Sequence, residues 1–119
     1  MNIIDCDFHD GMILSVSLLD EHVEILFEQW DCKQFRMSFG DYWRIKSFNP
    51  IGPEIDRMDM KSYGATINEV KKYIIDDGGA ENEVDGLNNY LFLDSSDAVI
   101  FEIVAREVKV KALTSDEIT

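Results

Sequence analysis

The chain contains 119 residues, of which 45% are hydrophobic, and it carries a formal net charge of −13 at pH 7. This size and composition predict one globular domain over residues 1–113, with a core that needs neither metal nor disulfide, and a disordered tail over residues 114–119. The negative charge argues against nucleic acid and anionic membranes as partners and favours a basic protein or cations. Because the N-terminus has no basic segment and no apolar run approaches the roughly 18 residues of a membrane span, we expect a cytoplasmic protein.

The acidic side chains are concentrated in two parts of the chain. Residues 1–32 and 73–105 contain no Lys or Arg and together hold 16 of the 24 acidic residues. Residues 33–72 instead carry eight basic residues against five acidic ones. The sequence therefore predicts a surface that is acidic toward both ends of the chain and mildly basic in between.

Alternating apolar residues predict an antiparallel meander over residues 12–48. A two-residue turn would place Leu14 opposite Phe27, and a longer loop would place Phe27 opposite Phe35. A shift of either register by one residue would turn half of the apolar side chains toward water, so the pattern defines the pairing. The three alternating sets are Leu14, Val16 and Leu18, then Val23, Ile25 and Phe27, then Phe35, Met37 and Phe39.

A fourth strand and one short helix are expected after these three strands. Residues 42–48 alternate again, which would place Trp43 in the core. Two prolines and a glycine then predict irregular structure over residues 49–65. A capping box that begins at Thr66 predicts the helix start, and polar residues 80–88 predict a mobile loop. The apolar helix positions are Ile67, Val70 and Ile74, and Gly78-Gly79 would close the helix.

The last part of the chain predicts a hairpin over residues 89–112. A four-residue turn would place Phe92 opposite Val99. The apolar phase changes between Ala105 and Val108, so we expect a bulge or bend near residues 106–107. The fold class is therefore mainly β (α+β with one short helix), in which the meander and the hairpin form a curved sheet or a small sandwich.

The N-terminus holds the densest cluster of potential metal ligands, namely Asp5, Asp7, His9 and Asp10. A calcium loop would need Gly at its sixth position and Glu at its twelfth. Counting from Asp5, the chain has Asp10 and Val16 there. We therefore favour a turn at Asp10-Gly11 that leads into the first strand, and keep a metal or ligand site as the alternative.

Zinc and nucleophilic catalysis are both disfavoured. A zinc site from Cys6, His9, His22 and Cys32 would have to close over a strand of roughly 20 Å, at about 3.3 Å per residue. Neither cysteine lies in a recognisable nucleophile motif. A cytoplasmic chain is expected to keep both thiols reduced. We expect no enzymatic activity and no cofactor.

The acidic region over residues 76–97 is the second candidate site. An exposed acidic surface suits a basic protein partner, and Trp30, expected on a hairpin loop, would serve as an anchor. A solvated face that keeps the protein soluble would account for the same charges. The candidate contact residues are Trp30, Asp76, Asp77, Glu81, Glu83 and Asp85.

Four short segments carry a resemblance to known proteins. They are His9-Asp10-Gly11 before an alternating strand, Val23–Phe27, Phe35–Phe39 and the terminal run Phe101–Val110. In this layout the chain resembles small bacterial β-rich domains, which include immunity proteins of polymorphic toxin systems. The resemblance implies a protein that binds and neutralises a cognate toxin by occlusion, with no catalytic residues.

Three functions are consistent with these observations. The first is a non-enzymatic module that binds a basic protein, such as a toxin, through its acidic surface. The second is a small metal- or ligand-binding domain that uses Asp5, Asp7, His9 and Asp10. The third is a structural homo-oligomer, for example a homodimer, formed by pairing of edge strands.

Overall fold

The computed structural model describes residues 1–114 of the chain. Within that range it contains one α-helix and one sheet of seven strands, so the prediction of a mainly β fold is confirmed. The predicted tail, from residue 115 onward, lies outside the described residues. The elements are η1 (Ile3–Asp5), β1 (Gly11–Leu18), β2 (His22–Glu28), β3 (Gln34–Ser47), β4 (Glu54–Ile55), β5 (Arg57–Lys61), α1 (Ala65–Asp76), η2 (Glu81–Glu83), β6 (Asn88–Leu93) and β7 (Val99–Ala112), where η denotes a 3-10 turn.

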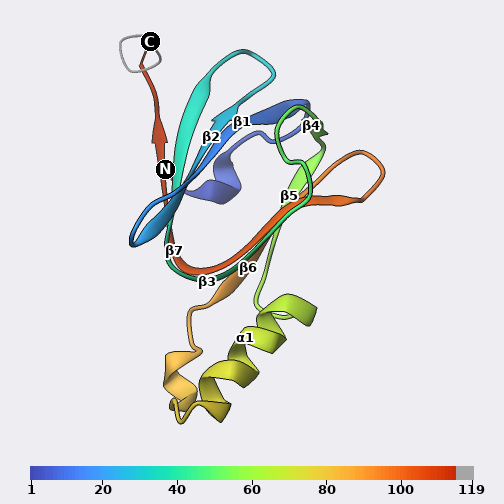
Figure 1. The fold of residues 1–119 in the computed structure, drawn as a ribbon. Coiled ribbons are helices and arrows are strands. Elements are labelled where there is room, and N and C mark those ends of the chain that lie inside the picture. The colour runs from blue at the N-terminus through green and yellow to red at the C-terminus, as the bar shows by residue number, and fades with distance from the viewer. Residues whose placement is uncertain (115–119) are drawn as a thin grey trace.

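The sheet curves until its two edges nearly meet (Figure 1). The strand order is β4-β1-β2-β3-β7-β6-β5, and all neighbouring strands are antiparallel. Asp56 alone separates the edge strands β4 and β5 in the chain, so one short stretch borders both edges. Of the two expected arrangements, the structure adopts the curved sheet, because β3 pairs with β7 and joins the meander to the hairpin.

The register of the meander follows the apolar alternation except at one position. Phe27 lies opposite Phe35, as predicted. In β1, an irregularity between Ile13 and Ser15 places Ile13 opposite Phe27, so the pairing predicted for Leu14 is wrong. Ile13 is fully buried, whereas Leu14 is only partly buried. A bulge adds one residue to a strand without interrupting its apolar pattern, which explains the error.

β3 is one long strand that turns a corner, rather than two strands. The corner lies at Asp41, whose backbone is in the left-handed region with φ 49°. β7 changes phase at the same level, since both Ala105 and Val108 pack in the main core. The predicted bend near residues 106–107 is therefore confirmed, and β3 and β7 bend together while they stay paired (Figure 1).

A bulge beside this corner turns Trp43 out of the core. Tyr42 pairs with Ala105 and Arg44 pairs with Val104, which leaves Trp43 outside the regular ladder. The Trp43 side chain is 41% exposed, so its predicted core position is wrong. An extra residue in a strand redirects the side chains that strict alternation would place on one face.

Residues 49–65 contain two short strands where the sequence predicts irregular structure. β4 pairs with β1, and β5 pairs with β6. The prediction holds for the start of the segment, where Asn49 and Gly52 have positive φ values of 54° and 109°. The strands were not recognisable because charged residues interrupt their short apolar pattern.

α1 begins one residue before the predicted capping box. Its N-cap is Gly64, which offers no capping side chain, and Thr66 lies buried inside the first turn. The helix ends as predicted, before Gly78, whose φ is 88°. The buried face of α1 forms a second apolar cluster against β7, on the face opposite the main core. This cluster consists of Ile67, Val70, Ile74, Leu87 and Val104.

β6 and β7 pair two residues away from the predicted register. Phe92 lies opposite Phe101 and not opposite Val99. One residue of the shift comes from the turn, in which the Asp94 carboxylate accepts hydrogen bonds from the backbone N–H groups of Ser96 and Ala98. The second comes from an irregularity in the pairing next to Phe92.

The N-terminal segment closes the core from the concave side of the sheet. Its Phe8 ring lies 5.1 Å from the Phe27 ring and 5.6 Å from the Phe92 ring, measured between centroids. Cys6 is buried beside it, Cys32 is exposed, and both are free thiols. Burial raises the pKa of the Cys6 thiol, so this cysteine stays protonated and is a weak nucleophile.

Candidate protein-binding surface

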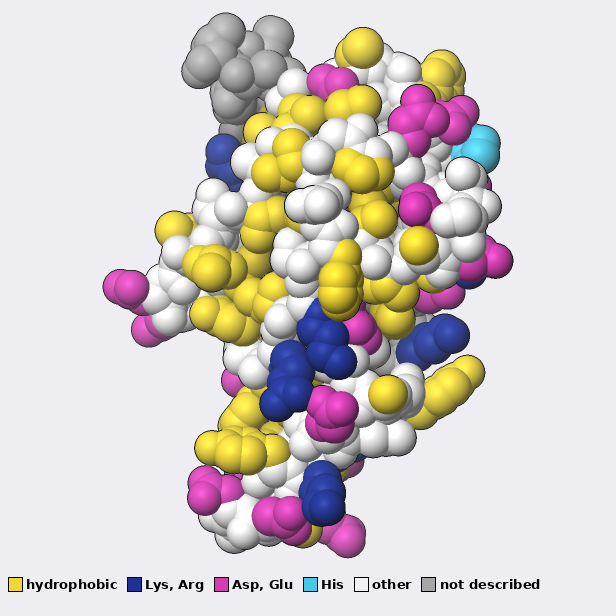
Figure 2. Space-filling model, turned by 45° about the vertical axis from the view of Figure 1, so that its right-hand side comes forward, with side chains coloured by type: hydrophobic (Ala, Val, Ile, Leu, Met, Phe, Trp, Pro, Cys, Tyr) yellow, Lys and Arg dark blue, Asp and Glu magenta, His cyan; other side chains and the backbone are white. Residues whose placement is uncertain are grey.

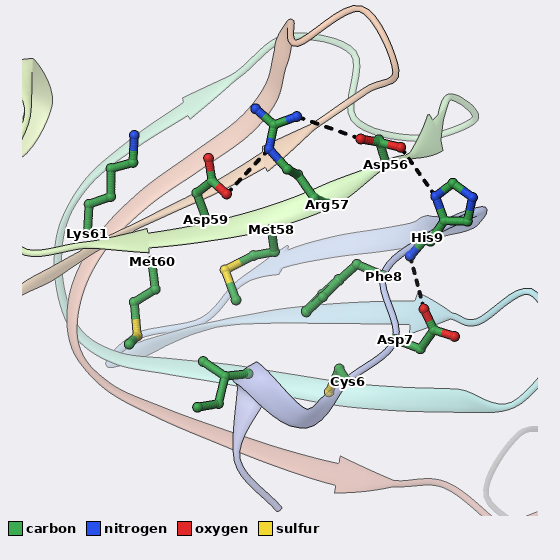
Figure 3. A pocket seen from close by; sticks show the side chains of 11 residues that line it. Cys6, Asp7, Phe8, His9, Asp56, Arg57, Met58, Asp59, Met60 and Lys61 are labelled. Atoms are coloured by element: carbon green, nitrogen blue, oxygen red, sulfur yellow. Dashed lines mark hydrogen bonds and ion pairs between the residues drawn. The ribbon is translucent and has the colours of Figure 1, made fainter.

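The N-terminal acidic cluster is held together by local contacts. The Asp7 carboxylate accepts a hydrogen bond of 3.3 Å from the backbone N–H of His9. The His9 ring places Nδ1 3.2 Å from Asp56 (Figure 3). Its Nε2 lies 3.5 Å from Asp10. Asp5 ends η1 and is exposed. Asp10 has φ 59° and forms the turn into β1 that the sequence favours.

Two of these residues, Asp7 and His9, border a groove rather than a metal centre. Within residues 1–114, no group of three or more His, Cys, Asp or Glu side chains is placed to hold a metal ion. The groove has a volume of about 550 Å³ and lies between the N-terminal segment and β5, with Phe8, Met58 and Met60 among its apolar residues (Figure 3). On its rim, Arg57 forms ion pairs with neighbouring carboxylates, so these charges already compensate one another.

The acidic residues of the second candidate site lie together at one end of the molecule. This is the end that holds α1, where acidic side chains gather on the surface (Figures 1 and 2). All of them are exposed, and among residues 1–114 none takes part in a salt bridge. We call this set the acidic end; it consists of Asp76, Asp77, Glu81, Glu83 and Asp85.

Two of these charges occupy positions that cost stability. Asp76 is the last residue of α1 and Asp77 is its C-cap, and the last turn holds no basic residue. The helix macrodipole is negative at this end, so each exposed carboxylate there is unfavourable by about 0.3–1 kcal/mol at low salt. A local violation of this kind is typical of positions that serve function rather than stability.

An aromatic pair lies beside the acidic end. The Trp43 and Tyr73 rings pack edge to face, with centroids 6.3 Å apart. Together with Arg44 and Val70 they line a hollow of about 310 Å³. Asp76 follows Tyr73 by three residues on α1, so the two share one side of the helix. Tyr73 is 60% exposed, which leaves its ring accessible to a partner.

Arg106 connects the segment that contains Glu83 and Asp85 to the sheet through hydrogen bonds. Its guanidinium group donates hydrogen bonds to the Asp41 carboxylate and to the backbone oxygens of Glu83 and Asp85. The same side chain therefore links the corner of β3 to the segment that follows α1. The guanidinium group binds backbone oxygens there, and the Glu83 and Asp85 carboxylates form no salt bridge with any residue that the structure describes. The segment predicted as a mobile loop contains η2 and is anchored at this point.

Replacing Arg106 by methionine is expected to loosen this segment without unfolding the domain. The substitution keeps an unbranched side chain but removes every N–H donor, and hydrogen bonds made by charged groups contribute about 1.5–3 kcal/mol each. Limited proteolysis with a glutamate-specific protease should cut after Glu81 or Glu83 faster than in the parent. Arg44→Met is the control, because Arg44 pairs with Glu69 instead. Equal cleavage rates in parent and Arg106→Met would contradict the anchoring role.

Trp30 does not belong to this surface. It lies in the turn between β2 and β3, at the end of the molecule opposite α1 (Figure 1). The longest dimension of the molecule is 46 Å. The Trp30 side chain is 63% exposed, and its indole N–H donates a hydrogen bond of 2.7 Å to Asp7. The structure therefore does not bring Trp30 together with the acidic residues in one contact surface.

Sequence reasoning missed Trp43, Tyr73 and Arg106. The spacing of Tyr73 and Asp76 on one predicted helix was available as a signal. The position of Trp43 depends on a bulge in β3 that the apolar pattern does not reveal. The apolar phase change predicts a bend near Arg106 but not the hydrogen bonds that its side chain forms.

Comparison of the chain with protein-family models, with curated proteins and with solved structures finds no match. Among the described residues, no helix has the length and apolar character needed to cross a bilayer.

Proposed function

We propose that the chain is a non-enzymatic module that binds a basic protein through the acidic end. The observation that carries the proposal is that these exposed carboxylates have no salt-bridge partner within residues 1–114. A concentrated negative surface accelerates the encounter with a basic partner and disfavours acidic ones. The resemblance to immunity proteins implies that the partner is a toxin, neutralised by occlusion in the cytoplasm.

The aromatic pair supports the same proposal. Protein interfaces are organised around a few anchors, often Trp and Tyr, that become fully desolvated inside a charged or polar rim. Trp43 and Tyr73 would form that anchor, and Asp76 and Asp77 would form part of the rim. This surface combines an apolar contact for affinity with charges for orientation.

A homo-oligomer formed by edge pairing has less support. β4 contains two residues and β5 contains five, so the sheet offers short free edges. Short edges and near closure are ways in which β proteins prevent edge-to-edge pairing. The metal-binding alternative has no cluster of ligands in residues 1–114 on which to rest.

In the first step of the test, the purified protein is immobilised on a resin and used to capture its partner from a lysate of the source organism. Bound protein is eluted with a salt gradient and identified by mass spectrometry. The dissociation constant of the purified pair is then measured for the parent and for a variant in which Asp76, Asp77, Glu81, Glu83 and Asp85 are all changed to Lys. We expect a basic partner and an affinity that falls by about 10- to 1,000-fold in the variant.

A control variant carries the same change in net charge elsewhere. It reverses five other exposed acids that form no salt bridge within residues 1–114, namely Asp5, Asp20, Glu21, Glu54 and Glu107. Circular dichroism would establish that both variants are folded. Equal affinities of the parent and the acidic-end variant would refute the proposal, and so would an equal loss in both variants, because net charge alone would then control binding.

A further inference from the structure

A further cavity lies at the opposite end of α1 from the acidic end. Its volume is about 350 Å³, within the usual range of about 300–1,000 Å³ for ligand pockets. The cavity is bordered by the N-cap Gly64, by the first two residues of α1, and by side chains of β3, β5, β6 and β7. It shares no lining residue with the groove beside the N-terminal segment except Lys61.

Two buried polar residues are among those that line this cavity. Asn89 is 2% exposed and Glu102 is 7% exposed. The Asn89 amide nitrogen donates a hydrogen bond of 2.6 Å to Glu102 Oε2. The amide nitrogen of Asn89 is therefore engaged by Glu102. Asn89 Oδ1 is consequently directed elsewhere, and it is the one buried side-chain polar atom among the described residues that has no hydrogen-bond partner.

This arrangement lowers the stability of the fold unless a hydrogen-bond donor enters the cavity. A buried acceptor without a partner costs about 1–3 kcal/mol. A buried carboxylate also requires compensation. Glu102 forms no salt bridge with any residue in 1–114, because its contact there is the neutral amide of Asn89. Both acceptors suit a group that is cationic and carries several N–H donors.

The rim of the same cavity is positively charged and therefore opposite in character to the acceptors of Asn89 and Glu102. Lys46 lies next to Glu102 across the sheet, and Lys61 lies next to Asn89. Neither lysine forms a salt bridge with another residue among 1–114. The first N–H groups of α1 add partial positive charge, since Gly64 provides no capping side chain. The rim therefore suits an anionic group.

We propose that this cavity binds a free α-amino acid. The ammonium group would donate to Glu102 and to Asn89 Oδ1, while the carboxylate would face Lys46, Lys61 and the start of α1. A zwitterion supplies in one small molecule the donors that the buried pair lacks and the negative charge that the rim attracts. The proposal does not depend on the protein-binding surface, and neither one requires the other.

NMR spectroscopy of the isotope-labelled full chain tests this directly. Each standard α-amino acid is added separately at millimolar concentration, and the signal of the Asn89 side-chain amide is followed. We expect at least one amino acid to shift this signal in a saturable manner. Its N-acetyl derivative lacks the ammonium group, and its amide derivative lacks the carboxylate. The affinity of each derivative should be lower than that of the free amino acid by at least about tenfold.

Variants distinguish this site from nonspecific binding. Glu102→Gln replaces the buried carboxyl group by an amide with little change in shape, and Lys61→Gln removes one charge from the rim. Each should weaken binding by about tenfold. Lys109→Gln, an exposed lysine on β7 away from the cavity, should leave binding unchanged. If no amino acid shifts the Asn89 signal, or if the N-acetyl derivative binds as well as the free amino acid, the proposal is overturned.

Discussion

Replacing Phe101 by alanine is expected to lower the free energy of unfolding by about 3–5 kcal/mol. Phe101 is fully buried, and its ring centroid lies 5.9 Å from that of Phe92. It sits on β7, which pairs with β3 on one side and with β6 on the other. Truncation would leave a cavity where the meander and the hairpin join, and this junction is too well packed to collapse into it. A domain with a total stability of about 5–15 kcal/mol would lose much of it.

Urea unfolding measured by circular dichroism gives this difference. Phe48→Ala serves as the matched control, because it removes the same atoms from an exposed side chain and should change stability by less than about 0.5 kcal/mol. A loss below about 1 kcal/mol for Phe101→Ala would be inconsistent with full burial at the centre of the sheet.

Replacing Tyr73 by alanine is expected to lower affinity for the partner by about 30-fold, which corresponds to about 2 kcal/mol. The Tyr73 ring is exposed and packs against Trp43, so the free domain should lose little stability. In the complex the ring would be desolvated beside Asp76 and Asp77. The loss should therefore arise in the dissociation rate rather than in folding.

Trp30→Ala is the comparison for this prediction. Both aromatic side chains are exposed, but Trp30 lies at the end of the molecule opposite α1 (Figure 1). We expect the affinity of Trp30→Ala to match that of the parent in isothermal titration calorimetry. A large loss for Trp30→Ala with none for Tyr73→Ala would place the partner at the wrong end of the molecule for the proposed interface.

Much of the sheet could be predicted from apolar alternation. The pairing of Phe27 with Phe35 follows from a period of two residues, because a shifted register would expose half of the apolar side chains. The same reasoning located the bend of β7, since the apolar phase changes on either side of residues 106–107. Burial on one face is thus enough to define register where the strands are regular.

The errors arose where the backbone departs from regular geometry. The bulges that displace Leu14 and Trp43 each add a residue that the apolar pattern does not reveal. In the C-terminal hairpin, the Asp94 side chain closes a longer turn than the apolar spacing suggests. The start of α1 shifted because Gly64 provides the N-cap and Thr66 is buried.

The acidic end and the cavity at the start of α1 differ in how far each could be predicted from the sequence. The acidic end could be identified in advance because its residues lie within one short stretch of chain, from 76 to 85, and charged side chains there are exposed. The cavity at the start of α1 could not, because Lys46, Asn89 and Glu102 come from three different strands. Their proximity depends on the pairing of β3 with β7, which the sequence leaves open, and on the register of β6 and β7, which lies two residues from the predicted one.

The association rate constant of the purified partner, measured by stopped flow over a range of salt concentrations, tests the proposed role of the acidic end most directly. Electrostatic steering should make association with the parent fall steeply as salt rises, by about tenfold or more. The variant with Lys at all five acidic-end positions should associate slowly at low salt and show no such fall. An association rate that does not depend on salt and is equal for the parent and this variant would contradict the account.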